Sequence, residues 1–215
     1  MPNLRLGYNF KHMKKIARGL KAGVLMANGF KDDEYLLLKN ELARAGFKMH
    51  VISPETTLKS EMIFLSELLP GVIHGILLRP DVRVEEAVAT DYDLLIVPGG
   101  AFSAYKLVSN DECISFIRNY LNEGKVMGAL SDGSRILEET GFNKGKHITI
   151  PKKYMPILVN SGLKLEDQPV VSDDGLVTCQ TSQQIKDFMS EMLHFLLIKK
   201  VYTDYLKSLK NKTNT

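Results

Sequence analysis

The sequence predicts an α/β fold in which an open, doubly wound and mostly parallel sheet carries helices on both faces. Two observations lead to this prediction. Short apolar runs typical of buried strands alternate along the chain with segments of helical spacing. Several of these runs also end in a turn rich in Gly, Pro, Asn or Ser, which is where such sheets form their ligand sites.

The first strand–helix–strand unit has the clearest pattern. Residues 22–27 form an apolar run, and residues 33–45 have helical spacing and end at Gly46. Residues 47–53 form the next apolar run, which Pro54 closes. Such a unit implies two parallel strands joined by a right-handed crossover.

The middle of the chain is less regular. Residues 61–69 fit either a helix or a strand, and residues 71–84 are typical of short strands broken at Pro80. Residues 92–97 form a β-rich apolar run that stops at the Pro-Gly-Gly turn of residues 98–100.

The second half of the chain continues the alternation of strands and helices. The first helix of this half ends at Gly124. The last helix leads into a polar end at residues 211–215, which is expected to fray. The strand ending at Cys179 is interrupted by a turn at residues 173–175. The expected helices are 111–123, 133–139 and 183–207, and the expected strands are 125–130, 147–150 and 169–179.

Length and composition indicate one soluble domain over residues 21–198, flanked by a basic extension at 1–20 and, at 199–215, by the end of the C-terminal helix and a polar tail. The formal net charge is +3, and acidic residues interrupt the lysines, so nucleic acid is not expected as a partner. No apolar run is long enough to span a membrane. The two cysteines are widely spaced, which predicts reduced thiols in a cytoplasmic protein, with no metal site and no cofactor.

The N-terminal extension is basic and amphipathic. No acidic residue precedes Asp32, and Phe10, Met13, Ile16 and Leu20 fall on one helical face. This pattern fits a transit peptide, a membrane-surface helix, or a short helix packed on the domain or on a partner subunit. The low serine content of the segment favours the short packed helix.

Three turns are expected to meet at the carboxyl edge of the sheet, at residues 28–34, 98–100 and 131–134. In the third turn, Ser131 lies between a strand and a helix, with the small residues Ala129 and Gly133 on either side. This spacing fits a nucleophile elbow, in which a tight turn exposes the reactive side chain. Ser and Asp are also favoured helix N-caps, so the hydroxyl of Ser131 has a purely structural interpretation as well.

The other two turns also have two interpretations. Gly99 and Gly100 offer backbone N–H groups for an oxyanion or another anion, or simply form a tight turn that needs a positive φ. The acids at residues 32–34 suit the helix dipole. Glu34 lies on the side that faces the strand ends, where partial burial would raise its pKa and let it share a proton.

Four stretches together resemble the ThiJ/PfpI family of the class I glutamine amidotransferase-like superfamily. They are "VLMANGFKDDEYLLLKNELARAGFKMHVIS", "DYDLLIVPGG", "EGKVMGALSDGSRILEETGFNKGKHIT" and "VVSDDGLVTC". The resemblance implies a flavodoxin-like sandwich, usually dimeric or larger, with deglycase or glyoxalase, chaperone-like or peptidase activity. The chain is also similar to the domain appended to the C-terminus of large-subunit catalases, which has this fold without the catalytic cysteine.

The resemblance assigns roles to several residues. Glu34 matches the family's acidic residue that hydrogen-bonds to the nucleophile, and Gly99 and Gly100 match the turn whose amides face the site. Ser131 falls where the family has its elbow cysteine, and Asp132 falls where many members have histidine. Two further departures lie downstream: Ile150 is near a position that is often histidine, and "CQTS" at 179–182 replaces a Ser-Arg-Gly-Pro segment.

These departures predict a divergent, non-catalytic member with a small-molecule or anion pocket beside Gly99, Gly100 and Gly133, and with a regulatory or stress-related role. A serine hydroxyl does not ionise usefully at a helix N-terminus and needs a base, yet none of the five histidines lies in the three turns. The alternative is a serine-dependent hydrolase or a glyoxalase- or deglycase-like enzyme, in which Ser131 attacks and Glu34 or Asp132 moves the proton. In either case we expect a homodimer, with the N-terminal segment and the long C-terminal helix as candidate interface elements.

Overall fold

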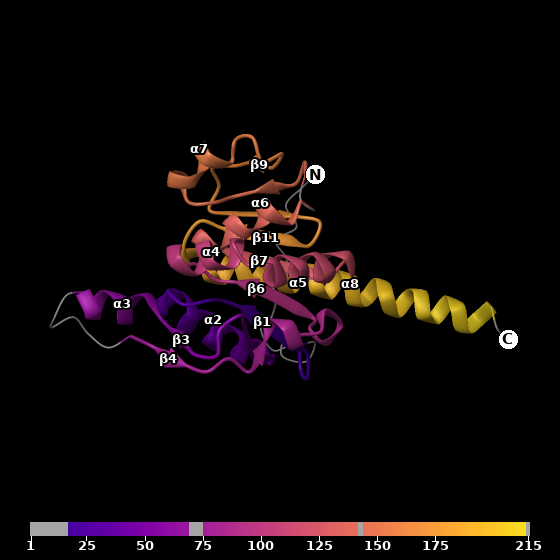
Figure 1. The fold of residues 1–215 in the computed structure, drawn as a ribbon. Coiled ribbons are helices and arrows are strands. Elements are labelled where there is room, and N and C mark those ends of the chain that lie inside the picture. The colour runs from indigo at the N-terminus through magenta and orange to yellow at the C-terminus, as the bar shows by residue number, and fades with distance from the viewer. Residues whose placement is uncertain (1–16, 69–74, 142–143, 214–215) are drawn as a thin grey trace.

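The computed structural model describes residues 17–68, 75–141 and 144–213 (Figure 1). Its centre is a seven-stranded sheet in the order β10-β11-β7-β6-β1-β2-β5, in which all neighbours are parallel except β10 and β11. This confirms the mostly parallel, doubly wound sheet. The strands are β1 (Lys21–Leu25), β2 (Lys48–Ser53), β5 (Val82–Arg83), β6 (Leu94–Val97), β7 (Val126–Leu130), β10 (Val170–Asp173) and β11 (Leu176–Cys179).

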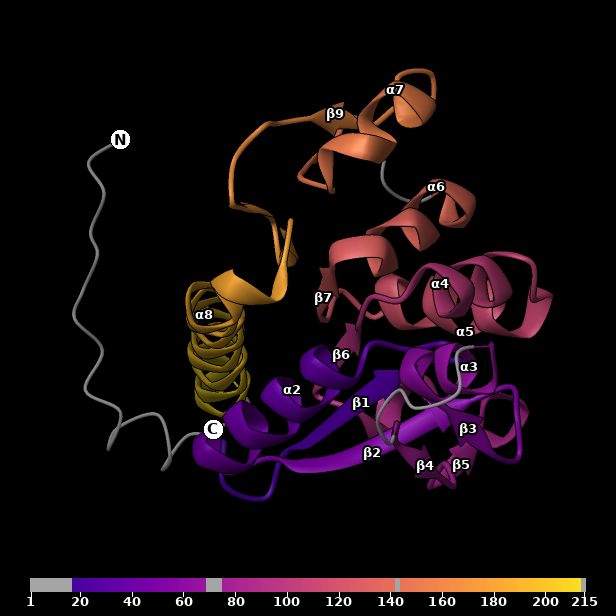
Figure 2. The same ribbon diagram turned by 90° about the vertical axis from the view of Figure 1, so that its left-hand side faces the viewer.

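Helices cover both faces of this sheet (Figure 2). Because side chains alternate along a strand, Val24 and Ile96 pack into the core under one helical layer, while Leu25 and Leu95 pack into the other. The first layer holds α2 (Asp32–Ala45) and α8 (Ile185–Thr213), and the second holds α4 (Ala101–Val108), α5 (Asp111–Asn122) and α6 (Ile136–Thr140).

Local signals in the sequence explain where the helices begin and end. Gly46 has a φ of 95°, and its amide donates to the carbonyls of Leu42 and Ala43, which ends α2 as predicted. The side chain of Asn110 accepts a hydrogen bond from the amide of Cys113 and caps α5. The helix α4, which the sequence did not predict, begins immediately after the Pro-Gly-Gly turn.

The irregular middle of the chain resolves into a helix and short strands. Residues that fitted either structure form the helix α3 (Glu61–Leu68). The strands β3 (Leu58–Lys59) and β4 (Leu77–Leu78) pair with each other outside the main sheet. After the break at Pro80, β5 joins the edge of the main sheet beside β2.

Two later segments differ from the prediction in detail. The strand expected at 147–150 shortens to β8 (His147–Ile148), which pairs with β9 (Lys164–Leu165) rather than with the main sheet. The short helix α7 (Met155–Leu158) lies between them in the chain. The helix α8 does not fray at residue 211 and continues to Thr213.

The predicted N-terminal helix, with Phe10, Met13 and Ile16, lies outside the described residues. Within those residues, the structure has no helix that is both long enough and apolar enough to cross a bilayer. Cys113 and Cys179 are both buried in the core and carry free thiols.

Candidate functional site

The strand order brings the three predicted turns together. Because β1, β6 and β7 are neighbours in the sheet, the turns that follow them meet at its carboxyl edge. The amide of Lys31 donates to the carbonyl of Gly99 at 3.2 Å, which joins the first turn to the second. The amide of Gly100 donates to Asp132 Oδ2 at 3.2 Å, which joins the second turn to the third.

Ser131 has the backbone of a nucleophile elbow. It follows β7 directly and has a φ of 50°, in the left-handed region that non-glycine residues rarely occupy. A Cβ at Gly133 would lie 2.4 Å from the carbonyl oxygen of Pro98, so only glycine fits there. The N-cap of the 3₁₀ turn Ser131–Arg135 is Leu130, and the hydroxyl of Ser131 bonds to Lys31 and Asp132, so it does not act as the helix cap that the sequence also allowed.

The hydroxyl of Ser131 is nevertheless engaged by neighbouring side chains. Lys31 Nζ donates to Ser131 Oγ at 3.0 Å, and Ser131 Oγ lies 3.5 Å from Asp132 Oδ2. Only 3% of Ser131 is exposed. The elbow is thus closed by Lys31, which comes from the first of the three turns.

Asp132 is the anion at the centre of the site. Its carboxylate is buried, with Lys31 Nζ 3.3 Å from Oδ2 and Lys153 Nζ 3.0 Å from Oδ1. Burial acts to raise the pKa of Asp132, but hydrogen bonds from Tyr154 and Lys153 and the charge of Lys31 hold it well below its usual range. Asp132 is therefore ionised at neutral pH and is a weak base.

Glu34 lies beside Lys31 and the Pro-Gly-Gly turn. It is buried, and its Oε2 accepts the amide of Gly99 at 2.6 Å. Burial raises the pKa of Glu34, and the amide of Gly99 and the charge of Lys31 oppose that rise. The amides of Gly99 and Gly100 therefore both donate to carboxylates of the chain itself.

Lys31 is the cation that these two acids share. Burial acts to lower its pKa, but the charges of Glu34 and Asp132 outweigh burial and raise it above its usual value. Lys31 is consequently an ammonium at neutral pH and has no lone pair with which to accept the proton of Ser131.

Four residues of this cluster carry no signal in the sequence that points to the elbow. Lys31 lies within the first turn, beside the acids that match the helix dipole. Lys153 and Tyr154 come from the 3₁₀ turn Lys152–Tyr154, a segment without a motif. Glu61, the first residue of α3, has a pKa raised by burial, and Lys31, Asp132 and Lys153 all act on it electrostatically. Only the tertiary structure brings these residues to the elbow.

The described histidines make their contacts elsewhere. His50 packs edge-on against Tyr92, His147 Nδ1 lies 2.5 Å from Glu166 Oε1, and His194 packs against Phe195. The remaining two, His12 and His74, are outside the described residues. Ile150 is fully buried, and burial raises the pKa of the Cys179 thiol well above its usual value.

Comparison with models of known protein families shows to which family the chain belongs. The model of the DJ-1/PfpI family matches residues 20–194. The chain belongs to the DJ-1/PfpI family. This confirms the resemblance to ThiJ/PfpI proteins.

Curated relatives cover most of the chain. An uncharacterized protein of Staphylococcus aureus (strain Mu50) is 31% identical over 175 residues, which are 80% of this chain and 96% of the relative. YraA of Bacillus subtilis, whose name calls it a candidate cysteine protease, is 28% identical over 176 residues, covering 82% and 98% of the two chains.

Solved structures of the family share the fold. DJ-1 of Schizosaccharomyces pombe has a TM-score of 0.69 at 22% identity, over 88% of this chain and 98% of that one. DJ-1beta of Drosophila melanogaster has a TM-score of 0.70 at 23% identity, over 88% and 97%.

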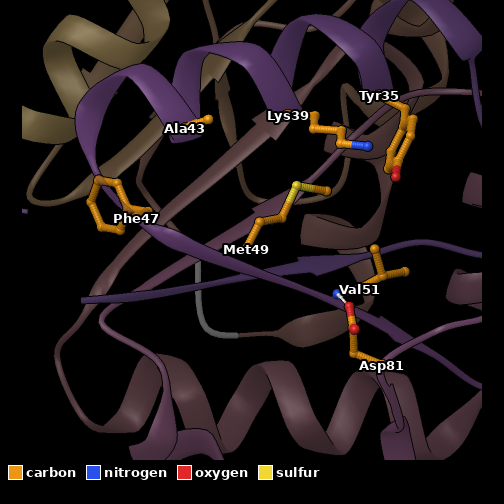
Figure 3. Close-up of a pocket in the computed structure, with 7 residues that line it drawn as sticks. All are labelled: Tyr35, Lys39, Ala43, Phe47, Met49, Val51 and Asp81. Carbon is orange, nitrogen blue, oxygen red and sulfur yellow. Dashed lines mark hydrogen bonds between the residues drawn. The ribbon is translucent and has the colours of Figure 1, made fainter. Parts of the chain in front are cut away.

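A separate pocket lies between α2 and β2 (Figure 3). It has a volume of about 360 Å³, which is within the range of small-molecule sites. Lys39 and Asp81 supply its charged groups, and Asp81 Oδ2 already accepts the amide of Val51 at 2.7 Å. The full lining is Tyr35, Lys39, Ala43, Phe47, Met49, Val51 and Asp81.

Proposed function

We propose that this DJ-1/PfpI protein is non-catalytic and binds a small anionic molecule at the elbow, in a regulatory role. One observation carries the proposal: Lys31 Nζ donates to Ser131 Oγ at 3.0 Å, while Glu34 and Asp132 keep Lys31 protonated. The carboxylate beside Ser131, Asp132 Oδ2 at 3.5 Å, has a lowered pKa and is too weak a base to activate a serine held in this way.

Two further requirements of acyl transfer also count against attack by Ser131. An oxyanion hole needs N–H donors that are free to meet the developing charge, and the Gly99 and Gly100 amides donate to Glu34 and Asp132 instead. A nucleophile also needs room for its substrate, whereas Ser131 is buried beneath Lys31. The elbow thus has the backbone of a nucleophile site, but Glu34, Asp132 and Lys31 occupy the hydrogen-bonding groups that a substrate would need.

The same side chains support the binding of an anion. Lys31 and Lys153 hold Asp132 from two sides, yet their side chains are 32% and 62% exposed. The three donors of the Lys31 ammonium are directed at Ser131, Glu34 and Asp132, so Lys31 attracts an anion through its charge. The more exposed Lys153 can keep Asp132 and also donate to an external carboxylate or phosphate. The free, buried thiols of Cys113 and Cys179 suit a reducing compartment, and we place the protein in the cytoplasm on that basis.

Thermal unfolding in the presence of inorganic phosphate or succinate tests the binding proposal. The midpoint should rise with anion concentration, because a ligand that binds only the folded state stabilises it. The Lys31→Met and Lys153→Met variants should lose most of that rise. Lys152→Met is the matched control, because Lys152 pairs with Asp167 at 2.7 Å and is not part of the cluster. An equal rise in all four proteins would contradict the proposal.

The second candidate function is a serine-dependent hydrolase or a glyoxalase- or deglycase-like enzyme, with Ser131 as nucleophile and Glu34 or Asp132 as base. The φ of 50° at Ser131 favours it, because such strain is typical of reactive residues. A screen of esterase and glyoxalase substrates with wild type and Ser131→Ala distinguishes the two functions. Equal rates would exclude Ser131 from any mechanism, and a loss of rate in the variant would establish the enzyme.

A further inference from the structure

The pocket between α2 and β2 shares no residue with the elbow and is built from two rows of side chains (Figure 3). Residues four apart in a helix share one face, and the row from α2 consists of Tyr35, Lys39 and Ala43. Alternate residues of a strand point to one face of the sheet, and the row at β2 consists of Phe47, Met49 and Val51. The volume of about 360 Å³ is near the lower end of the range of small-molecule sites, which fits a small ligand.

One end of the pocket is apolar. Phe47 and Val51 are only 7% and 5% exposed and belong to the core, and the half-buried Met49 packs against the same core. Figure 3 shows the side chain of Met49 between Phe47 on one side and Tyr35 and Lys39 on the other. This end therefore offers a surface to an aliphatic or aromatic group.

The other end of the pocket offers two hydrogen-bond donors. Lys39 Nζ lies 6.0 Å from the centre of the Tyr35 ring, so the ammonium and the phenol are neighbours. Among the residues that the structure describes, no carboxylate pairs with Lys39 and no group hydrogen-bonds to the hydroxyl of Tyr35. Burial and the charge of Asp81 raise the pKa of Tyr35, so the hydroxyl keeps its proton at neutral pH. Two donors that both need an acceptor favour a carboxylate as their ligand.

Asp81 supplies a negative charge at the same end of the pocket and is fixed to the edge of β2. Its Oδ2 accepts the amide of Val51 at 2.7 Å, and its own amide donates to the carbonyl of Val51 at 2.9 Å. No cation in the described part of the chain pairs with this carboxylate, so Oδ1 can accept from a ligand. Asp81 repels a ligand that is only an anion, and Lys39 repels one that is only a cation. The two charges together favour a ligand that carries both.

We propose that this pocket binds a small zwitterion with an apolar side chain, the class to which the apolar α-amino acids belong. The carboxylate of the ligand accepts hydrogen bonds from Lys39 and Tyr35, and its ammonium donates to Asp81 Oδ1. The apolar side chain lies over Met49 toward Phe47, where it is removed from water. This proposal does not depend on the function of the elbow.

NMR of the protein with labelled methionine methyl groups tests the proposal, because Met49 lies within the pocket and its signal is assigned with Met49→Leu. Addition of L-leucine should shift the Met49 signal until the site is saturated. Lys39→Gln should weaken leucine binding about tenfold, because it removes a charged hydrogen bond. Lys48→Gln is the matched control: Lys48 is an exposed lysine of β2 that does not line the pocket, and the variant should bind leucine as wild type does.

Two analogues of leucine test whether both charges are recognised. The compound 4-methylpentanoate lacks the ammonium of leucine, and 3-methylbutylamine lacks its carboxylate. Each should bind wild type about tenfold more weakly than leucine does. In Asp81→Asn, leucine and 4-methylpentanoate should bind with similar affinity, because asparagine removes the negative charge and keeps an oxygen for the amide of Val51.

Three results would overturn the proposal. One is a Met49 signal that does not move at any concentration of L-leucine. Another is an equal affinity of wild type for leucine and 4-methylpentanoate, since the pocket would then recognise a carboxylate without help from Asp81. The third is an equal loss of leucine binding in Lys39→Gln and Lys48→Gln, which would show an effect of overall charge rather than of the pocket.

Discussion

Lys31 Nζ donates to Ser131 Oγ at 3.0 Å, although the two residues are far apart in the sequence. The contact fixes the hydroxyl at the tip of a strained turn, where a nucleophile would need a partner that removes its proton. Lys31 supplies a positive charge instead, because Glu34 and Asp132 keep it protonated. Ser131 thus has the strained backbone of a reactive residue, but its hydroxyl faces an ammonium that cannot remove its proton.

Replacing Lys31 with methionine should destabilise the protein by about 2–3 kcal/mol at pH 7, because two buried carboxylates lose a shared cation. Urea unfolding measures the difference, with Lys152→Met as the control that removes an exposed lysine. A loss of the same size in the control would show that the effect is not specific to the elbow.

Replacing Asp132 with asparagine should cost about 3 kcal/mol at pH 7, because Lys31 and Lys153 lose the anion between them. The pKa of Asp132 is lowered in the folded state, so its contribution is complete above its unfolded value of 3.8 and is lost as the pH falls through the folded value. The difference between wild type and variant should therefore stay constant from about pH 8 to pH 5 and narrow below about pH 4. A difference that grows on acidification would contradict this assignment.

Glu34→Gln should behave in the opposite way. Burial raises the pKa of Glu34 in the folded state, so the charged side chain opposes folding as the pH rises from 4.5 through the folded value. The glutamine keeps an oxygen acceptor for the amide of Gly99 and removes the buried charge. We expect the variant to be more stable than wild type by on the order of 1 kcal/mol at pH 8 and equal to it at pH 4. Chemical unfolding at the two pH values measures this, and a less stable variant at pH 8 would be the contrary result.

Gly133→Ala tests the packing of the elbow. The added Cβ would lie 2.4 Å from the carbonyl oxygen of Pro98 and 2.6 Å from that of Val97, so we expect a loss of about 2–3 kcal/mol. Gly124→Ala is the control, because Gly124 has a φ of 63° but open space around a Cβ, and strain alone should cost about 1 kcal/mol. Thermal unfolding should rank Gly133→Ala clearly below Gly124→Ala. Equal midpoints would mean that the turn can relax.

The sequence could predict the frame of the site because that frame depends on local patterns. The apolar runs that became β1, β6 and β7 each ended in a recognisable turn, and parallel strands place such turns at one edge. The small residue at Gly133 was also readable, since a tight turn after Ser131 requires it.

The electrostatics of the site could not be predicted in the same way. Lys153 and Tyr154 belong to a short 3₁₀ turn without periodicity or motif, and only the fold carries them to Asp132. The protonation of Lys31 depends on the buried carboxylates of Glu34 and Asp132, and no local sequence pattern indicates that these acids are buried beside it. The same limit explains β8, which the sequence marks as a strand but which pairs with β9 outside the main sheet.

The reactivity of Ser131 toward a fluorophosphonate tests the central claim most directly, because such probes modify a serine hydroxyl only when a neighbouring base activates it. Intact-mass analysis after incubation at pH 7 to 8 should show no adduct on the wild-type protein, as expected for a hydroxyl held by the Lys31 ammonium. A stoichiometric adduct on Ser131 that disappears in Ser131→Ala would contradict the account and establish a serine-dependent enzyme.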